Sequence, residues 1–102
     1  MNQKWKNVKK LIEYSKGGIL SKVLVSTDKH NITLFCMAKG TEISEHTSTK
    51  EGFIFVVEGK GMFNLKGEDI EMSQDVIIFM QKNAVHSVKA KENMSFLLSL
   101  NN

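Results

Sequence analysis

The chain has 102 residues, of which 41% are hydrophobic and 25% are charged, values that are ordinary for a single soluble globular domain. No apolar run approaches the roughly 20 residues that span a bilayer, and the first ten residues lack the apolar segment of a signal peptide. The single cysteine excludes an internal disulfide, so nothing in the sequence indicates an oxidising compartment, and we expect a cytoplasmic protein. Because no apolar run is long enough to span a bilayer, we expect no membrane partner.

The positive charge is concentrated near the N-terminus. Residues 1–30 carry seven lysines against Glu13 and Asp28, although the formal net charge of the whole chain is only +3. Every positive charge is a lysine, and no arginine is present for bidentate contacts to phosphate or guanine. These lysines predict a solvated surface, and we expect no nucleic-acid partner.

The N-terminal arm, residues 1–18, has a helical pattern. Trp5, Val8 and Ile12 recur at steps of three and four residues, which predicts a short amphipathic helix within residues 4–13. Such a short helix is not stable alone, so we expect Trp5 and Ile12 to dock on the main body. Gly17 and Gly18 end the arm.

From residue 19 onward the hydrophobic pattern indicates β-structure. Short apolar or alternating runs follow one another, separated by turn residues, as is typical of an all-β sandwich or barrel. No domain boundary is visible, so we expect one domain over residues 1–102 with its barrel in 19–100. The predicted strands are 19–25, 32–37, 53–57, 62–65, 70–72, 76–80, 85–90 and 94–100.

Residues 40–59 hold one histidine, His46, between two glycines, Gly40 and Gly59. The spacing of these three residues resembles, in register, the first motif of the cupins, usually written G-x5-H-x-H-x3-E-x6-G. Ser48 stands where the second histidine belongs, and Gly52 stands where the glutamate belongs.

A later stretch is similar to the second cupin motif, G-x5-P-x-G-x2-H-x3-N. Asp75, Gln81, Asn83, His86 and Ala90 occupy its places, and only His86 matches outright. Asparagine tolerates the left-handed backbone that the loop glycine supplies, so Asn83 can replace it. The chain thus resembles the small single-domain bacterial cupins of uncharacterised role. This resemblance implies a double-stranded β-helix, a jelly-roll-like barrel, preceded by a short helical or irregular segment.

The resemblance also implies a metal site, of which two of the four usual ligand places are kept. His46 and His86 should project into the barrel together, and two imidazoles suit Zn, Fe, Mn or Ni. A stable site usually needs a third protein ligand. A β-bulge at Gly52 would turn the neighbouring Glu51 inward to supply one. Without it, we expect no cofactor.

Alternation along the strands then predicts a pocket. Taking the ligand places as inward, Gly52, Ile54 and Val56 share one strand's inner face, and His86 and Val88 share another's. Together with His46 and Ser48, these residues would form a mostly apolar small-molecule site. The alternative is that Ile54, Val56 and Val88 simply fill a closed core.

The opposite face of residues 53–57 carries Phe53, Phe55 and Val57. A large apolar patch on a protein surface usually marks an interface. Either the N-terminal arm or a second copy of the chain covers this face, and cupins commonly pair, so we expect a homodimer.

Three functions remain open on the sequence. The first is a barrel that binds an unknown small molecule and has a degenerate metal site. The second is a metal-dependent enzyme of the dioxygenase, isomerase or decarboxylase type. The third alternative is a closed structural or interaction barrel. No catalytic residue is assigned, and whether the chain is an enzyme stays undecided.

Overall fold

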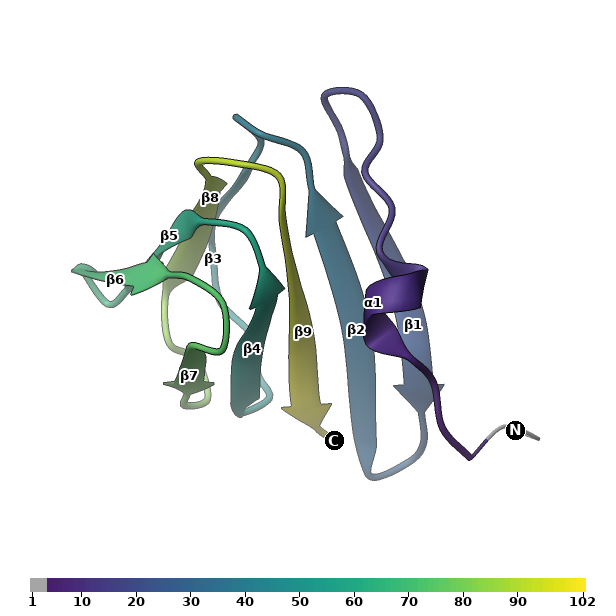
Figure 1. The fold of residues 1–102 in the computed structure, drawn as a ribbon. Coiled ribbons are helices and arrows are strands. Elements are labelled where there is room, and N and C mark those ends of the chain that lie inside the picture. Colours follow the sequence, from purple (N-terminus) through teal and green to yellow (C-terminus); the bar gives the residue numbers. More distant parts are fainter. Residues whose placement is uncertain (1–3) are drawn as a thin grey trace.

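The computed structural model describes residues 4–102, which form nine strands and one short helix (Figure 1). Their bounds are α1 Val8–Leu11, β1 Ile19–Ser26, β2 His30–Met37, β3 Glu42–His46, β4 Gly52–Glu58, β5 Gly61–Leu65, β6 Glu68–Met72, β7 Ile77–Met80, β8 His86–Ala90 and β9 Met94–Asn101. Each of the eight predicted strands is present. The ninth, β3, was not predicted, because its sequence EISEH contains only one large apolar residue.

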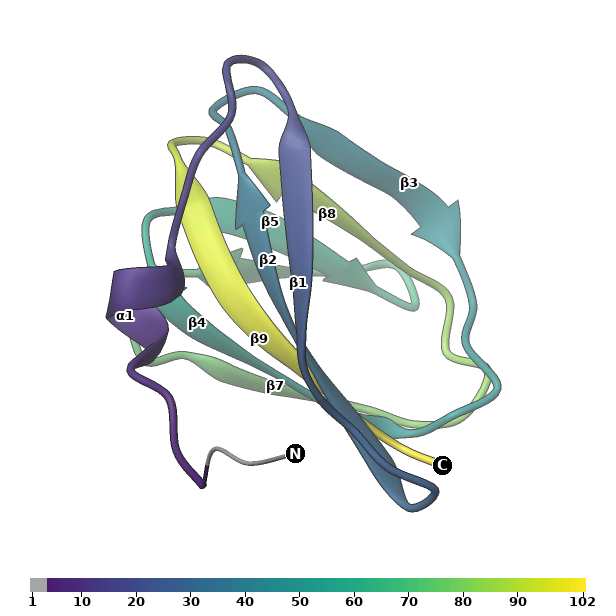
Figure 2. The same cartoon turned by 90° about the vertical axis from the view of Figure 1, so that its right-hand side faces the viewer.

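The strands form two antiparallel sheets that face each other (Figure 2). The five-stranded sheet has the order β1-β2-β9-β4-β7, and the four-stranded sheet has the order β3-β8-β5-β6. Sequence neighbours are therefore often separated: β4, for example, lies between β7 and β9. The expected all-β, jelly-roll-like fold with a short N-terminal helix is confirmed.

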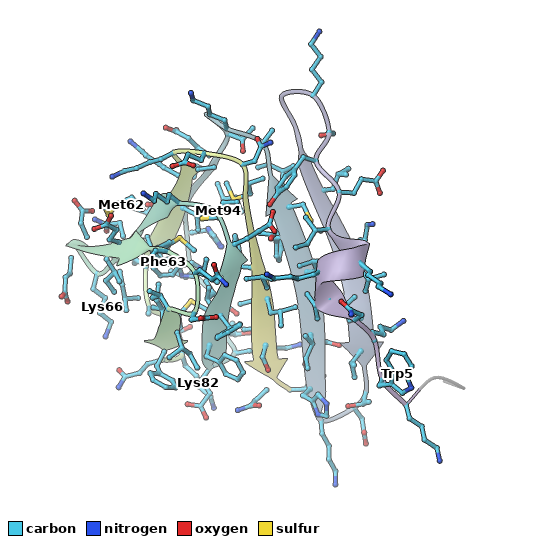
Figure 3. The ribbon with its side chains drawn as sticks, in the orientation of Figure 1. Trp5, Met62, Phe63, Lys66, Lys82 and Met94 are labelled. Atoms are coloured by element: carbon cyan, nitrogen blue, oxygen red, sulfur yellow. The ribbon has the colours of Figure 1, made fainter. Side chains whose placement is uncertain are left out.

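The hydrophobic core lies between the sheets. Side chains from both sheets contribute to it, among them Phe63 of β5 and Met94 of β9, which are fully buried (Figure 3). Ile54 and Val56 point inward from β4, as the alternation predicted. The buried members are Met37, Ile54, Val56, Phe63, Met72, Ile78, Met80, Val88, Ala90, Met94 and Phe96.

The N-terminal arm is less helical than its sequence pattern predicts. Its helix is a single turn, capped by Asn7, whose side chain accepts a hydrogen bond from the Lys10 N–H at 3.3 Å. Ile12 is already extended and half-buried. The docking predicted for Trp5 is wrong, because this side chain is 80% exposed (Figure 3). Within residues 4–102, no helix is long and apolar enough to cross a membrane.

The arm is fastened to the outer face of the five-stranded sheet. Lys22 of β1 donates to the Leu11 carbonyl at 2.8 Å and pairs with the Glu13 carboxylate at 3.1 Å. Figure 1 shows α1 lying across β1 and β2. Below the arm, Leu34 and Cys36 of β2 are fully buried. The arm therefore covers part of the outer face, over β1 and β2.

A second fastening joins the arm to β4. The Tyr14 hydroxyl donates to the Glu58 carboxylate at 2.8 Å. Burial, together with the hydrogen bond and the negative charge of Glu58, raises the pKa of Tyr14 to about 12, against a partly opposing effect of the nearby Ser95 side chain. The phenol therefore stays protonated well above pH 10 in the folded protein.

This contact predicts a measurable alkaline titration. Tyr14 is the only tyrosine, so the tyrosinate absorbance of the folded protein should rise with a midpoint near 12. Since the unfolded phenol ionises near 10, the unfolded chain binds fewer protons, and stability should decline as pH rises from about 10 towards 12. A Glu58→Gln variant should lower the midpoint. A wild-type midpoint near 10 in folded protein would contradict the contact.

Candidate functional site

The structure brings His46 and His86, here called the histidine pair, into direct contact. Strands β3 and β8 are antiparallel neighbours, and His46 is paired with His86 in their register. The centroids of the two rings lie 4.1 Å apart, with an angle of 61° between the ring planes. A β-bulge between Ile43 and His46 precedes this pair. Two side chains that are 40 positions apart in the sequence thus form one site.

Each imidazole is oriented by its own strand. Nδ1 of His46 lies 2.8 Å from the Ser44 carbonyl oxygen, and Nδ1 of His86 lies 2.8 Å from the Ala84 carbonyl oxygen. A carbonyl only accepts, so Nδ1 carries a proton in both rings. In the neutral form the lone pair is then on Nε2, the ring atom that can accept a hydrogen bond.

The two rings differ in their exposure. His86 is only 7% exposed and stacks on the buried Phe63, with 5.7 Å between ring centroids, whereas His46 is exposed. Burial lowers the pKa of His86, partly opposed by its hydrogen bond to the Ala84 carbonyl, and the nearby His46 lowers it further. At neutral pH, His86 is therefore a neutral imidazole.

The lowered pKa of His86 predicts that acid destabilises the fold. Below about pH 6.5 the unfolded chain protonates His86 before the folded chain does. The unfolded state then binds more protons, so stability present above that pH should be lost as pH falls. Urea unfolding from pH 8 to pH 5 should show a shallower pH dependence in His86→Gln. The matched variant His30→Gln, changed at the exposed first residue of β2, should keep the wild-type slope. An unchanged slope in His86→Gln would contradict this role.

Ser48, at the place of the second motif histidine, holds a loop instead of joining the histidine pair. Its hydroxyl accepts from the Lys50 N–H at 3.1 Å, and its carbonyl accepts from the Asn83 N–H at 2.7 Å. Ser48 lies two residues beyond the end of β3. It thus links the two loops that follow the first motif histidine and precede the second.

Gly52, at the place of the motif glutamate, leaves no room for a side chain. A Cβ atom built on it would overlap the Ser99 carbonyl oxygen and lie 2.8 Å from the Ser99 carbonyl carbon. The neighbouring strand β9 therefore runs through the space where a glutamate side chain would begin. Glycine is required here for close backbone approach.

Glu51 is not brought to the histidine pair. The bulge expected at Gly52 is absent, because β4 pairs with β7 and with β9 without interruption from Gly52 to Phe55; its register shift lies between Val56 and Glu58. Glu51 is exposed, and its carbonyl accepts from the Asn101 N–H at 2.9 Å. Among residues 4–102, no three His, Cys, Asp or Glu side chains gather where they could hold a metal ion. The residues present do not fit a three- or four-ligand metal site.

The remaining residues predicted for the pocket are deeply buried. Ile54, Val56 and Val88 are at most 3% exposed and belong to the core cluster. They pack against side chains from both sheets, which is the arrangement of a filled interior. The polar part of the site therefore lies at the margin of the core, where His46 meets solvent.

The outer face of β4 and β7 carries the aromatic residues predicted for an interface. Phe53 and Phe55 are half-buried, and Val57 is 8% exposed and so is not part of an open patch. Register pairs Phe53 with Phe79, and the latter is 71% exposed. Ile77, paired with Phe55, is 46% exposed.

The loop residues at the motif glycine places have the backbone that these places require. Gly40 and Gly59 have φ values of 85° and 90°. Asp75 and Asn83, which replace motif glycines, have φ values of 73° and 64°. The replacement predicted for Asn83 is confirmed, and the left-handed backbone of Asp75 was missed.

Two contacts of the site have no clear signal in the sequence. The stacking of Phe63 on His86 depends on the β5–β8 register, in which Phe63 pairs with Val88 and Leu65 pairs with His86. The Ser44 and Ala84 carbonyls that hold the imidazoles belong to the backbone, so residue identity does not reveal them. The exposed Phe79 was missed because its strand, residues 76–80, is apolar at every position.

Comparison with known proteins places this architecture in a family. The cupin domain model matches residues 33–99. A conserved protein of unknown function from Streptococcus pyogenes is 22% identical, with a TM-score of 0.88 over 100% of this chain and 90% of that one. A cupin superfamily protein from Desulfitobacterium hafniense is 20% identical, with a TM-score of 0.89 over 99% and 94%.

One similar structure is an enzyme. A mutant salicylate 1,2-dioxygenase from Pseudoaminobacter salicylatoxidans is 14% identical, with a TM-score of 0.78 over 82% of this chain and 26% of that one. No curated protein matches the sequence. At these identities the structural likeness shows the fold alone, whereas the family model covers more than half of the chain. The chain therefore belongs to the cupin family.

Proposed function

We propose that this cupin binds a small organic molecule at the histidine pair and has no resident metal. The observation that carries the proposal is the fixed orientation of both imidazoles, whose Nδ1 atoms lie 2.8 Å from backbone carbonyls. Nε2 of the neutral His86 then accepts hydrogen bonds, so the ligand has to offer donors, as the hydroxyl groups of a sugar or a hydroxy acid do. The exposed His46 gives such a ligand access.

The second candidate is a metal-dependent enzyme. An imidazole that donates its other N–H to a carbonyl is typical of metal-ligating histidines, and this observation favours the candidate. When bound, a divalent Zn, Fe, Mn or Ni ion would supply Lewis acidity or redox chemistry, and His46 and His86 would hold it. Two protein ligands fall short of the usual three, and we derive no reaction step from them.

The third candidate, a closed structural barrel, is supported by the filled core at Ile54, Val56 and Val88. A ligand screen separates it from a binding protein. Thermal unfolding of untagged protein against a panel of sugars and hydroxy acids should identify ligands that raise Tm in the wild type and in His30→Ala. The same ligands should have no effect in His46→Ala/His86→Ala. If no compound shifts Tm in the wild type, the closed barrel is favoured and the proposal fails.

We infer that the protein is a homodimer that buries the outer face of β4 and β7. Phe79 and Ile77 are 71% and 46% exposed beside Phe53 and Phe55, an apolar patch that a second copy would cover.

The buried, unpaired thiol of Cys36 suits a reducing compartment, and we place the protein in the cytoplasm.

If the protein is a homodimer through this face, one charged residue placed in the interface should separate the two copies. Light scattering coupled to gel filtration should give twice the chain mass at micromolar concentration for the wild type. Phe79→Asp should give a monomer, because an aspartate would lose its hydration in the apolar interface. Val23→Asp, a change at a 66% exposed valine on the other edge strand β1, should remain dimeric. A monomeric wild type would overturn the inference.

A further inference from the structure

The outer face of the five-stranded sheet carries a row of three neighbouring residues beside the N-terminal arm. Cys36 of β2 is paired with Ser95 of β9, and Ser95 is paired with Glu58 of β4. The residue that follows each of the first two along its strand, Met37 or Phe96, belongs to the core. Because side chains alternate along a strand, Cys36 and Ser95 point to the outer face. We call Cys36, Ser95 and Glu58 the thiol row.

Tyr14 of the arm covers the thiol row. Its hydroxyl donates to the Glu58 carboxylate at 2.8 Å, and β9 lies between β2 and β4, so the side chain extends over β9. Burial raises the pKa of Tyr14, and the Ser95 and Cys36 side chains also affect this pKa, which places both beside the phenol. Cys36 and Ser95 are each 0% exposed. Reagents in solvent therefore do not reach the sulfur atom while the arm lies on the sheet.

One polar atom beneath Tyr14 is unsatisfied. Within residues 4–102, the Ser95 Oγ atom is buried and has no hydrogen-bond partner. A hydroxyl group that is buried without a partner raises the free energy of the state in which it is buried. When the arm lifts, water or a polar group attached beside Ser95 satisfies this hydroxyl. The closed position of the arm thus carries a cost that the lifted position does not.

The arm is held to the sheet by a few exposed or half-buried contacts. Lys22 contacts the Leu11 carbonyl and the Glu13 carboxylate, and Tyr14 contacts Glu58. None of residues 4–18 is fully buried or belongs to the core cluster. A segment with few buried apolar contacts opens without unfolding the rest of the protein. We therefore expect the arm to lift from the thiol row while the two sheets stay folded.

We propose that Cys36 is a modification site for low-molecular-weight disulfides and that the N-terminal arm controls access to it. With the arm lifted, the Cys36 thiolate attacks one sulfur atom of the small disulfide. The S–S bond of that disulfide breaks, and a new S–S bond joins Cys36 to one half of it. The other half leaves as a thiolate and takes up a proton, which balances the proton that Cys36 released. Cys36 is oxidised and the small disulfide is reduced.

The attached group changes the position of the arm. Because Cys36 and Ser95 are fully buried beneath Tyr14, a group on the sulfur atom has to displace the Tyr14 side chain. The chain has a single cysteine, so no second thiol of the same chain removes the group, whereas a free small thiol does. The arm thus responds to the ratio of small disulfide to free thiol. This site is separate from the histidine pair and does not depend on the function proposed there.

Ellman's reagent, a small aromatic disulfide that releases a coloured thiolate, measures the reaction in the folded protein. The wild type should release one thiolate per chain. Tyr14→Phe keeps the ring but loses the hydrogen bond to Glu58, so the arm should lift more often and the reaction should be about tenfold faster. No reaction in the folded wild type, or an unchanged rate in Tyr14→Phe, would overturn the proposal.

Met72→Ala is the matched control for global unfolding. Met72 is fully buried on β6 of the other sheet, so its loss should raise the unfolded population about thirtyfold or more without changing a contact of the arm. Its reaction with Ellman's reagent should stay within about twofold of the wild-type rate. A rate that rises in proportion to the unfolded population would show that Cys36 reacts only after global unfolding, and would refute the control by the arm.

Glutathione disulfide tests the displacement of the arm. The adduct should be cleaved by trypsin after Lys16, an exposed residue of the arm, about tenfold faster than the reduced protein. Removal of the adduct with dithiothreitol should restore the slow rate. Cys36→Ala, treated in the same way, should show no change in cleavage. Equal cleavage of the adduct and the reduced protein would show that the arm stays closed over the modified cysteine, against the proposal.

Discussion

Replacing Gly52 with alanine is expected to lower the free energy of unfolding by about 3 kcal/mol or more. The added methyl group would overlap the Ser99 carbonyl oxygen of β9, which is backbone and has no alternative rotamer. To make room, β4 and β9 would have to separate where Gly52 pairs with Leu100. Urea unfolding of the two proteins, followed by circular dichroism, measures the difference.

Gly40 offers a matched control. Its φ of 85° disfavours alanine, but a Cβ built there meets no atom within 4 Å. Gly40→Ala should therefore cost only about 1–2 kcal/mol, the penalty of a left-handed backbone. If Gly52→Ala were as stable as Gly40→Ala, the close approach of β9 would be wrong, and a glutamate at this place would become sterically possible.

Replacing Phe63 with alanine is expected to cost about 3–5 kcal/mol and to change the titration of His86. Phe63 is fully buried in the core, and its ring stacks on His86 with an interplanar angle of 11°. Its loss leaves a cavity beside the imidazole, into which water can enter. Because burial is the main cause of the lowered pKa of His86, this pKa should rise towards its ordinary value.

A variant at Phe96 separates the loss of stability from the change in the pKa of His86. It is 2% exposed and belongs to the same core, but its ring stacks on Phe35 at 5.2 Å instead of on a histidine. Phe96→Ala should lose a similar stability and leave the pKa of His86 unchanged. NMR titration of the imidazole protons measures the pKa in each variant. An unchanged pKa in Phe63→Ala would show that Phe63 does not keep water from His86.

Much of the fold was predictable because local pattern and family motif agree. Alternation identified Ile54 and Val56 as inward, and the motif frame located Asn83 in a left-handed loop. The arm was less predictable. The spacing of Trp5 and Ile12 suits a helix, but only one turn forms, and contacts with Lys22 and Glu58 hold the arm to the sheet. Tertiary contacts outweigh a weak local preference in so short a segment.

The histidine pair was predictable only through the motif resemblance. The residues between His46 and His86 do not predict that β3 pairs with β8. Strand β3 itself lacks the alternation of apolar and polar residues that would identify it as a strand. The absent bulge at Gly52 and the carbonyls that hold each Nδ1 follow from backbone geometry. The sequence shows that glycine stands at position 52 in place of the motif glutamate. It does not show that the backbone of β9 occupies the space where a glutamate side chain would begin.

Whether the histidine pair holds a resident metal is tested most directly by elemental analysis of protein purified without a histidine tag, before and after loading with Zn, Mn, Ni and Fe followed by gel filtration. We expect far less than one equivalent of each metal to be retained, with no difference between the wild type and His46→Ala/His86→Ala. Near-stoichiometric metal in the wild type that is lost in the double variant would contradict it.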